Sequence, residues 1–282
     1  MNAPLLSSSS TSSASRPSGG VEGPRVRPNL AHAFGGVWRL SIRRYYSPSR
    51  WLMLAGMLVV LGAFSIPATT TQAQAAREFL PWAARIYVGF LVPLLAFLSA
   101  AGLVRDDLQA GSVDYLFTRP VRRPVFVGLR YLAHASCTQI DFLFGLAVIA
   151  GLGIFHQVPG LAEALPLLLL AQVVAIMAFS AFGFLCAMIT SRYVIIGLLY
   201  GALIEVGLGN VPTQLSSLSM SRQILTILAP LLERSGGNSP MVVAAMSAPI
   251  AAGILLGTAV VMLGLTALIF HVREPAGSLA RE

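Results

Sequence analysis

One apolar segment of the chain carries three side chains of the kinds that bind metals and transfer protons. His134, Cys137 and Asp141 follow one another at i, i+3 and i+7, which places them on one face of a helix. Imidazole, thiolate and carboxylate groups are metal ligands, and the first and last also act as acids and bases. The simpler interpretation is a polar helix face turned toward other helices, because so few mixed ligands without a second cluster define a metal site poorly.

Two acidic residues lie inside stretches that are otherwise apolar, Asp141 and Glu205. A carboxylate at the centre of a bilayer costs roughly 2.5–3.5 kcal/mol, so each needs a partner, a wet cavity or a proton. Such residues often line a transport path or a gate, but each could instead hydrogen-bond a neighbouring helix. For Glu205 we expect a gating or structural role at the outer mouth. For Asp141 both interpretations stay open.

A charged stretch separates two of the apolar segments and reads LVRDDLQAGSVDYLFTRPVRR from Leu103 to Arg123. It holds three of the eleven acidic and four of the nineteen basic residues. Val113, Leu116 and Phe117 form an apolar face at helical spacing, and Pro120 ends a helix at the residue before it. The pattern predicts two short amphipathic helices under a bilayer that form a docking surface. A solvated loop that anchors its flanks is the alternative.

Composition restricts the class of protein. The chain is 56% hydrophobic and 11% charged, with 19 basic residues and a net charge of +8, whereas soluble domains carry about 25% charged residues. It is therefore expected to be a polytopic membrane protein, whose positive charges mark cytoplasmic loops rather than a nucleic-acid surface. All basic residues are arginines. Without lysine the chain cannot form the G-K-[ST] phosphate loop, which excludes a standard nucleotide-hydrolysing site.

Six segments are long and apolar enough to cross a membrane, given that a spanning helix needs about 20 residues. The sequence therefore predicts an all-α fold with six transmembrane helices. These are Trp51–Thr70, Ile86–Val104, Leu132–Phe155, Ala164–Thr190, Tyr193–Leu208 and Ala248–His271, the fifth being short.

The arginines predict the orientation. With both termini inside, fifteen arginines flank the cytoplasmic ends and four the outer ends, as the positive-inside rule requires. Residues 1–36, rich in Ser, Pro and Gly, are expected to be a disordered cytoplasmic tail, 37–273 the transmembrane domain and 274–282 a short cytoplasmic tail. A rival interpretation treats the Arg43-Arg44 pair and the first apolar run as a cleaved twin-arginine signal, although five more spans follow.

The outer segment from Gly209 to Ser247 is expected to form short helices that dip into the membrane between the fifth and sixth spans. Leu215, Leu218, Leu225 and Leu228 recur in it at helical spacing. Two glycine pairs could let helices approach closely, within one chain or between two subunits. They are Gly197 with Gly201 and Gly253 with Gly257.

The charged stretch resembles the cytoplasmic loop of ABC-2 type transporter permeases, in which an acidic residue, Gly-Thr, a second acidic residue, an apolar run and Arg-Pro-Val-x-Arg follow in order. The outer segment IEVGLGNVPTQLSSLSMSRQ is similar to the stretch that leads into the re-entrant helices of that family. Ser112 stands for the usual threonine, and aspartates stand for the commoner glutamates. The matching positions are Asp107, Gly111, Ser112, Asp114, Leu116, Arg119, Pro120, Val121 and Arg123.

This resemblance implies the membrane-spanning subunit of an ABC exporter in the cell membrane, not an enzyme by itself. Two permeases, identical or related, would pair. Each would bind a separate cytoplasmic ATPase, which carries ATP and Mg²⁺, through a coupling helix in the loop between spans two and three. Arginines of the N-terminal region would contact anionic lipid. No cofactor, metal or nucleic acid is expected on this chain.

Two other classes of function remain as alternatives. An intramembrane enzyme would use His134, Cys137 and Asp141, although the chain lacks a serine nucleophile elbow and an HExxH motif. An ion-coupled secondary carrier would use Asp141 and Glu205, although the two halves of the sequence show no convincing repeat.

Overall fold

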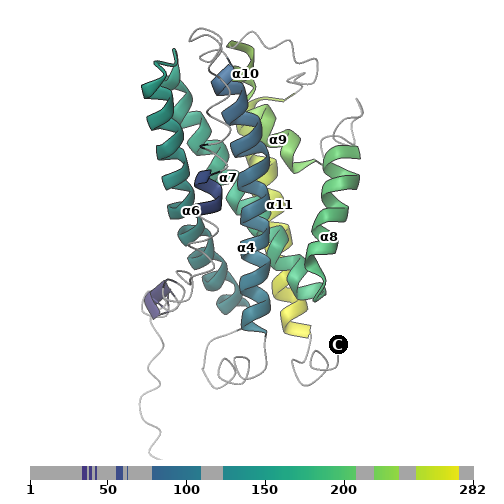
Figure 1. Cartoon of the computed structure of the whole chain (residues 1–282). Helices are drawn as coiled ribbons and strands as arrows, with labels where there is room; N and C mark the ends of the chain where they lie inside the picture. Colours follow the sequence, from purple (N-terminus) through teal and green to yellow (C-terminus); the bar gives the residue numbers. More distant parts are fainter. Residues whose placement is uncertain are drawn as a thin grey trace, which may run out of the picture.

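The computed structural model describes residues 34–36, 38–39, 42, 55–59, 62, 78–108, 123–207, 219–234 and 246–272. Within these ranges the regular elements are all helical (Figure 1). The main elements are η1 (Ala83–Leu91), α4 (Val92–Asp107), α6 (Arg123–Phe155), α7 (Leu161–Ile189), α8 (Tyr193–Tyr200), η2 (Gly201–Gly207), α9 (Met220–Ile227), α10 (Ala229–Arg234) and α11 (Ala248–Val272).

Four helices of the described part are long and apolar enough to cross a membrane. They are Glu78–Asp107, Pro124–Phe155, Leu161–Ile189 and Ala248–Val272. They correspond to the second, third, fourth and sixth predicted spans, and they define the chain as a polytopic α-helical membrane protein. The first predicted span lies mostly outside the described residues.

Two of these helices are longer than the sequence predicts. The second begins at Glu78 rather than Ile86 and ends at Asp107, and the third begins at Arg123 rather than Leu132. A helix of 30 residues is about 45 Å long, whereas the hydrocarbon layer is about 30 Å thick. Hydropathy marks only the part inside the hydrocarbon, so the prediction missed the turns that continue into charged residues.

The segment η1 is π-helical and runs directly into α4. Pro93 occupies one of the first two positions of α4. Proline has no N–H to donate and crowds the preceding turn, and wider π-helical turns before it relieve that crowding. Tyr87 lies within this segment and is fully buried.

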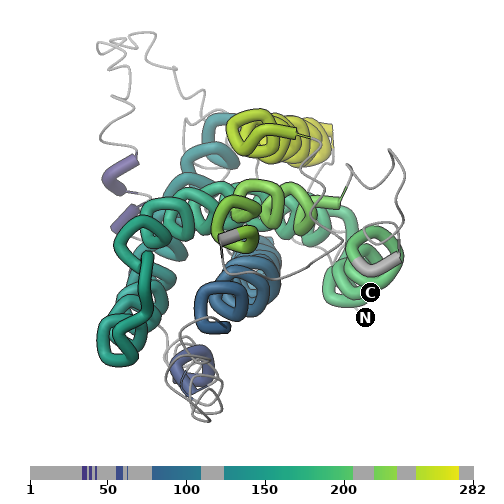
Figure 2. The backbone as a smooth tube through the Cα atoms, turned by 90° about the horizontal axis from the view of Figure 1, so that it is seen from above, coloured from purple at the N-terminus to yellow at the C-terminus, as the bar shows by residue number. Residues whose placement is uncertain are grey.

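The helix α7 lies at the centre of the bundle. Viewed along the bundle, α4 packs on one side of α7 and α11 on the other, with α6 and α8 at the two ends of the row (Figure 2). Most of α7 is buried, including Ala171, Ala175 and Ala178. Small side chains at these positions let the neighbouring helices approach closely, which favours dispersion contacts where lipid removes the hydrophobic driving force.

A close backbone contact joins α4 and α7 at Gly183. A Cβ atom at this position would lie 2.6 Å from the carbonyl oxygen of Phe97 and 3.0 Å from Cβ of Ala100. The ring of Phe97 then lies against α8, where a Cβ on Gly197 would come within 2.4 Å of it. Gly183 therefore lets α4 pack against α7, and Gly197 leaves room for the ring of Phe97 against α8.

The fifth predicted span is observed as α8 continued by η2, Tyr193–Gly207. Its fifteen residues reach about 22 Å, less than the thickness of the hydrocarbon layer. No residue of α8 is buried within the described part of the chain. This helix stands at the edge of the bundle (Figure 2).

The expected short helices between the fifth and sixth spans are present as α9 and α10, at the end of the bundle opposite Asp107 (Figure 1). The leucine spacing predicted their buried face only in part. Leu228 is buried and Leu225 is half-buried, but the buried residues of α9 itself are Met220, Gln223, Ile224 and Ile227.

Replacing Gly183 by alanine should destabilise the protein. The added methyl group meets a backbone oxygen that cannot turn away, so we expect a loss of about 1–3 kcal/mol, as for other overpacked cores. Gly151→Ala in α6 is the matched control, because nothing lies within 4 Å of its Cβ position in the described part. Thermal unfolding followed by size-exclusion fluorescence in detergent measures both. Equal melting temperatures for the two variants would contradict the close contact.

Candidate functional site

A buried ion pair joins the ends of the two helices that flank the charged stretch. Asp107 is the last residue of α4, and Arg130 lies two turns into α6. Arg130 Nε donates to Asp107 Oδ2 at 2.6 Å, and Nη2 donates to Oδ1 at 2.9 Å. The arginine side chain is 4% exposed and the aspartate side chain 15%. This parallel two-bond geometry is the strong form of the arginine–carboxylate interaction.

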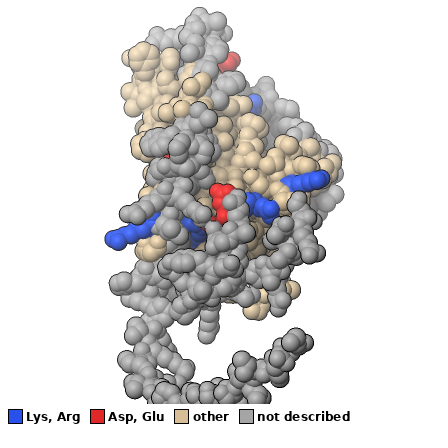
Figure 3. Space-filling model, turned by 60° about the horizontal axis from the view of Figure 1, so that its bottom comes forward, with Lys and Arg blue, Asp and Glu red and all other residues tan. Residues whose placement is uncertain are grey.

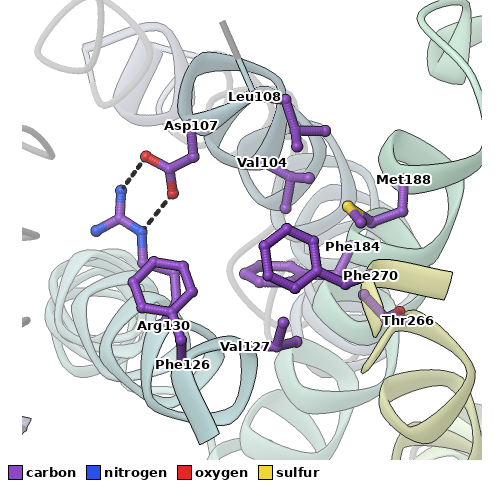
Figure 4. A pocket seen from close by; sticks show the side chains of 10 residues that line it. All are labelled: Val104, Asp107, Leu108, Phe126, Val127, Arg130, Phe184, Met188, Thr266 and Phe270. Atoms are coloured by element: carbon purple, nitrogen blue, oxygen red, sulfur yellow. Dashed lines mark hydrogen bonds and ion pairs between the residues drawn. The ribbon is translucent and has the colours of Figure 1, made fainter. Parts of the chain in front are cut away.

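The ion pair borders a small cavity between α4, α6, α7 and α11 (Figure 4). Apart from the ion pair and the hydroxyl of Thr266, its lining is apolar: Val104, Leu108, Phe126, Val127, Phe184, Met188 and Phe270. The volume of about 40 Å³ suffices for water but not for a drug-sized ligand. The apolar lining lowers the local dielectric, which strengthens the attraction between the two charges.

The ion pair changes the interpretation of the predicted loop. The sequence places Asp107 in the loop and Arg130 at its end, but both lie in helices, and Arg123 is the first residue of α6. The loop between the helix ends is therefore shorter than predicted. Its other predicted docking residues lie outside the described residues: Gly111, Ser112, Val113, Asp114, Leu116, Phe117, Arg119 and Pro120.

Sequence reasoning missed the role of Arg130, which it counted only as one more cytoplasmic charge. One signal could have shown it. The residue stands among apolar residues, PVFVGLRYLAHA, where an arginine needs a carboxylate to remain buried. Seen from this end of the bundle, several arginine and acidic side chains of the described part lie in a row across the molecule, whereas others lie farther away (Figure 3).

The three candidate residues of α6 all point into the bundle. His134 and Cys137 are buried and Asp141 is 7% exposed. Thr138 Oγ1 lies 3.3 Å from His134 Nε2, and the ring of His134 packs against Phe184 of α7 with centroids 5.9 Å apart. Among the described residues, no three metal-ligating side chains come together in a way that could hold a metal ion. These contacts are those of a packed polar face.

At the residue that follows Asp141 in α6, a second buried polar group joins three helical segments. The hydroxyl of Tyr87 in η1 lies 2.6 Å from the carbonyl oxygen of Phe142 in α6 and 2.9 Å from Gln172 Oε1 in α7. A Cβ on Gly145 would come 2.9 Å from this hydroxyl, so the absence of a side chain there makes room for it. Because no water competes in the hydrocarbon, such bonds hold the helices in one rotation about their axes.

Glu205 lies in η2 and binds the beginning of α9. The hydroxyl of Ser219 donates to its Oε2 at 2.7 Å, and the backbone N–H of Ser221 donates to the same oxygen at 3.0 Å. The N–H of Met220 donates to Oε1 at 3.1 Å. The carboxylate therefore occupies the helix N-terminus, where unpaired N–H groups and the helix dipole favour negative charge.

The glycines of the two predicted pairs differ in whether another helix packs against them. Gly197 packs on Phe97, whereas Gly201, Gly253 and Gly257 have open space around their Cβ positions within the described part. The first contact lies inside one chain. The described residues supply no packing partner for the other three glycines.

The fold and these sites define a helical membrane protein with ion-paired helix ends and a capped short helix at the opposite end. No protein-family model matches this chain, and no curated protein sequence matches it.

The buried ion pair can be tested by a double-mutant cycle. Asp107→Asn leaves a buried guanidinium without its carboxylate, and Arg130→Gln does the reverse. We expect each to lower the free energy of unfolding by about 3 kcal/mol. The double variant should lose clearly less than the sum of the two, since the partners are coupled.

Asp106→Asn is the matched control, because Asp106 is the exposed neighbour of Asp107 and its loss should have little effect. Urea or thermal unfolding of the purified protein gives the four free energies. Effects of the two single variants that simply add would show that the charges are not coupled.

Proposed function

We propose that the chain is the membrane-spanning subunit of an ABC exporter of the ABC-2 type. A separate cytoplasmic subunit would hydrolyse ATP, and the segment 109–122 would dock on it. The observation that supports this most is the Asp107–Arg130 ion pair, because it joins the two helices between which that segment runs.

A docking loop transmits force only when its ends are stiffly attached to the helices that must move. Two parallel hydrogen bonds fix both the distance and the angle between the end of α4 and the start of α6. The surroundings are mostly apolar and the Arg130 side chain is 4% exposed, so few water molecules can compete for these bonds. A push on the segment would therefore act on α4 and α6 together rather than bend one helix end.

The sequence supports the same function in two further ways. The charged stretch carries the order of residues that resembles the family's docking loop, including Asp114 and the Arg119-Pro120 pair. The absence of lysine from the whole chain fits a protein whose nucleotide site lies on a partner.

The proposal extends to the arrangement in the membrane. Six spans with both termini in the cytoplasm follow from the apolar segments and from the fifteen-to-four division of the arginines. In that orientation Asp107 and Arg130 lie at the cytoplasmic end, and α9 and α10 lie at the outer end, where the family has its re-entrant helices. The protein would reside in the cell membrane, pair with a second permease and contact anionic lipid through its N-terminal arginines.

An ion-coupled carrier is the second candidate, and the buried polar face of α6 is the observation that favours it. His134 and Asp141 are ionisable groups inside the bundle, where such groups are rare and often functional. A carrier of this kind would need no ATPase, so the two candidates differ in a property that can be measured directly.

The exporter proposal predicts a stable complex with a cytoplasmic P-loop ATPase. The tagged protein, purified from its own host in mild detergent, should bring this ATPase down in equal amount, as identified by mass spectrometry. Changing Val113 and Phe117 to aspartate should abolish the association, because the apolar docking face would become charged.

The matched control changes Val21 and Val26 to aspartate in the N-terminal segment, which adds the same charge away from the docking face. This variant should retain the ATPase. Purification of the intact protein without any P-loop ATPase would rule out the exporter and favour the carrier.

A further inference from the structure

The short helix α9 rests in a seat formed by four other elements. It contacts η1, η2, α7 and α11 at the end of the bundle opposite the ion pair (Figure 1). Its inner face is mainly apolar, with Met220, Ile224 and Ile227 buried beside the polar side chain of Gln223. On the side of η1, Gly89 lies next to α9, since a Cβ there would be at ordinary contact distance, 3.7 Å, from Leu225 Cδ2.

The helix is too short to be stable by itself. It has eight residues, whereas isolated helices shorter than about 12–15 residues are marginal in water. Its helical state therefore depends on the seat and on the groups that satisfy its first N–H groups. When these contacts are lost, neither the position of α9 nor its helical conformation is stabilised.

Three of the polar contacts at the beginning of α9 come together on one side chain from outside the helix. Glu205 accepts from Ser219, Met220 and Ser221, and Ser219 Oγ in turn accepts from the N–H of Arg222 at 3.1 Å. Hydrogen bonds to a charged acceptor are about twice as strong as neutral ones. A single carboxylate on η2 thus stabilises the whole first turn.

Two of the four elements of the seat, η1 and η2, are π-helical. π-Helical turns are rare and occur frequently at functional sites. Conversion to α-helix would rotate the side chains that face α9, Glu205 among them. Two elements of the seat therefore have an uncommon helical geometry.

An aromatic contact series connects the capped end of α9 to the centre of the bundle. The ring of Phe182 in α7 lies 5.3 Å from Phe97 in α4 and 4.5 Å from Tyr200 in α8, measured between centroids. The Tyr200 hydroxyl interacts with the Glu205 carboxylate. Movement of α4 relative to α8 would thus reach Glu205 through packed side chains.

We propose that α9 is a lid over this end of the bundle and that Glu205 is its latch. Weakening the Glu205 contacts releases the helix as a unit and uncovers η1 beneath it. The location of α9 at the outer mouth rests on the proposed function, but the role of Glu205 as its latch does not.

Hydrogen–deuterium exchange of the whole protein in lipid nanodiscs tests this. In Glu205→Gln an amide NH₂ replaces one acceptor oxygen and the charge is lost, so we expect the backbone amides of 220–228 to exchange roughly tenfold faster or more. Amides of η1 that face α9 should exchange faster too. Glu233→Gln on the adjacent α10 removes the same charge from an exposed side chain and should change neither region.

The pattern of exchange separates a lid from a simple helix cap. Faster exchange limited to Met220, Ser221 and Arg222 would show that Glu205 only caps the first turn, and would overturn the lid. Unchanged exchange throughout α9 would overturn the latch as well.

A second measurement uses Ser219→Ala, a milder change that also covers the case in which Glu205→Gln does not fold. Ile224→Cys, introduced on the buried face of α9, should react with a membrane-impermeant maleimide faster when combined with Ser219→Ala than alone. The native thiols Cys137 and Cys186 are buried and keep the background low. Equal labelling rates would contradict the proposal. Neither measurement needs an ATPase, so failure of the exporter function would leave the result interpretable.

Discussion

The close contact of α4 with α7 is the interaction on which the rest of the bundle depends. In lipid no hydrophobic force drives helices together, so their association relies on backbones that approach closely and on polar bonds between them. Gly183 supplies the first condition, and the Tyr87 hydroxyl, bonded to α6 and α7, supplies the second. With α4 and α7 in place, α11 covers the other face of α7, and α8 is positioned against Phe97.

The lipid environment also explains where the charged side chains lie. The two best-defined ionic arrangements occupy opposite ends of the bundle, where a carboxylate can be satisfied without crossing hydrocarbon. At one end Asp107 meets a guanidinium, and at the other Glu205 meets a hydroxyl and two backbone N–H groups. In both cases the carboxylate joins elements that the chain itself separates. Each arrangement therefore fixes the position of one element relative to another, which neutral packing does less specifically.

The interior polar groups of α6 have a different character. His134 and Asp141 lie inside the helix bundle of a single chain rather than on its lipid-facing side, and the contacts seen for His134 are with Thr138 and Phe184. Neither His134 nor Asp141 lines the cavity beside Arg130 and Phe184, whose volume is about 40 Å³. A polar face of this kind sets the rotation of α6 about its axis, because the wrong rotation would place ionisable groups in lipid.

Amino-acid order alone establishes that the chain is a membrane protein, where most of its spans lie, and that short helices precede the last one. These properties are local: a run of apolar residues must form a helix in hydrocarbon because each backbone group has to be satisfied within its own segment. The partners of the polar residues, in contrast, depend on how the helices are arranged in three dimensions. Arg130 stands 23 residues from Asp107, and Glu205 stands 14 from Ser219, and such pairs form only when helices have a particular depth and rotation. The sequence identifies the polar residues that need a partner. Which partner each of them meets depends on distances that are set only when the helices pack.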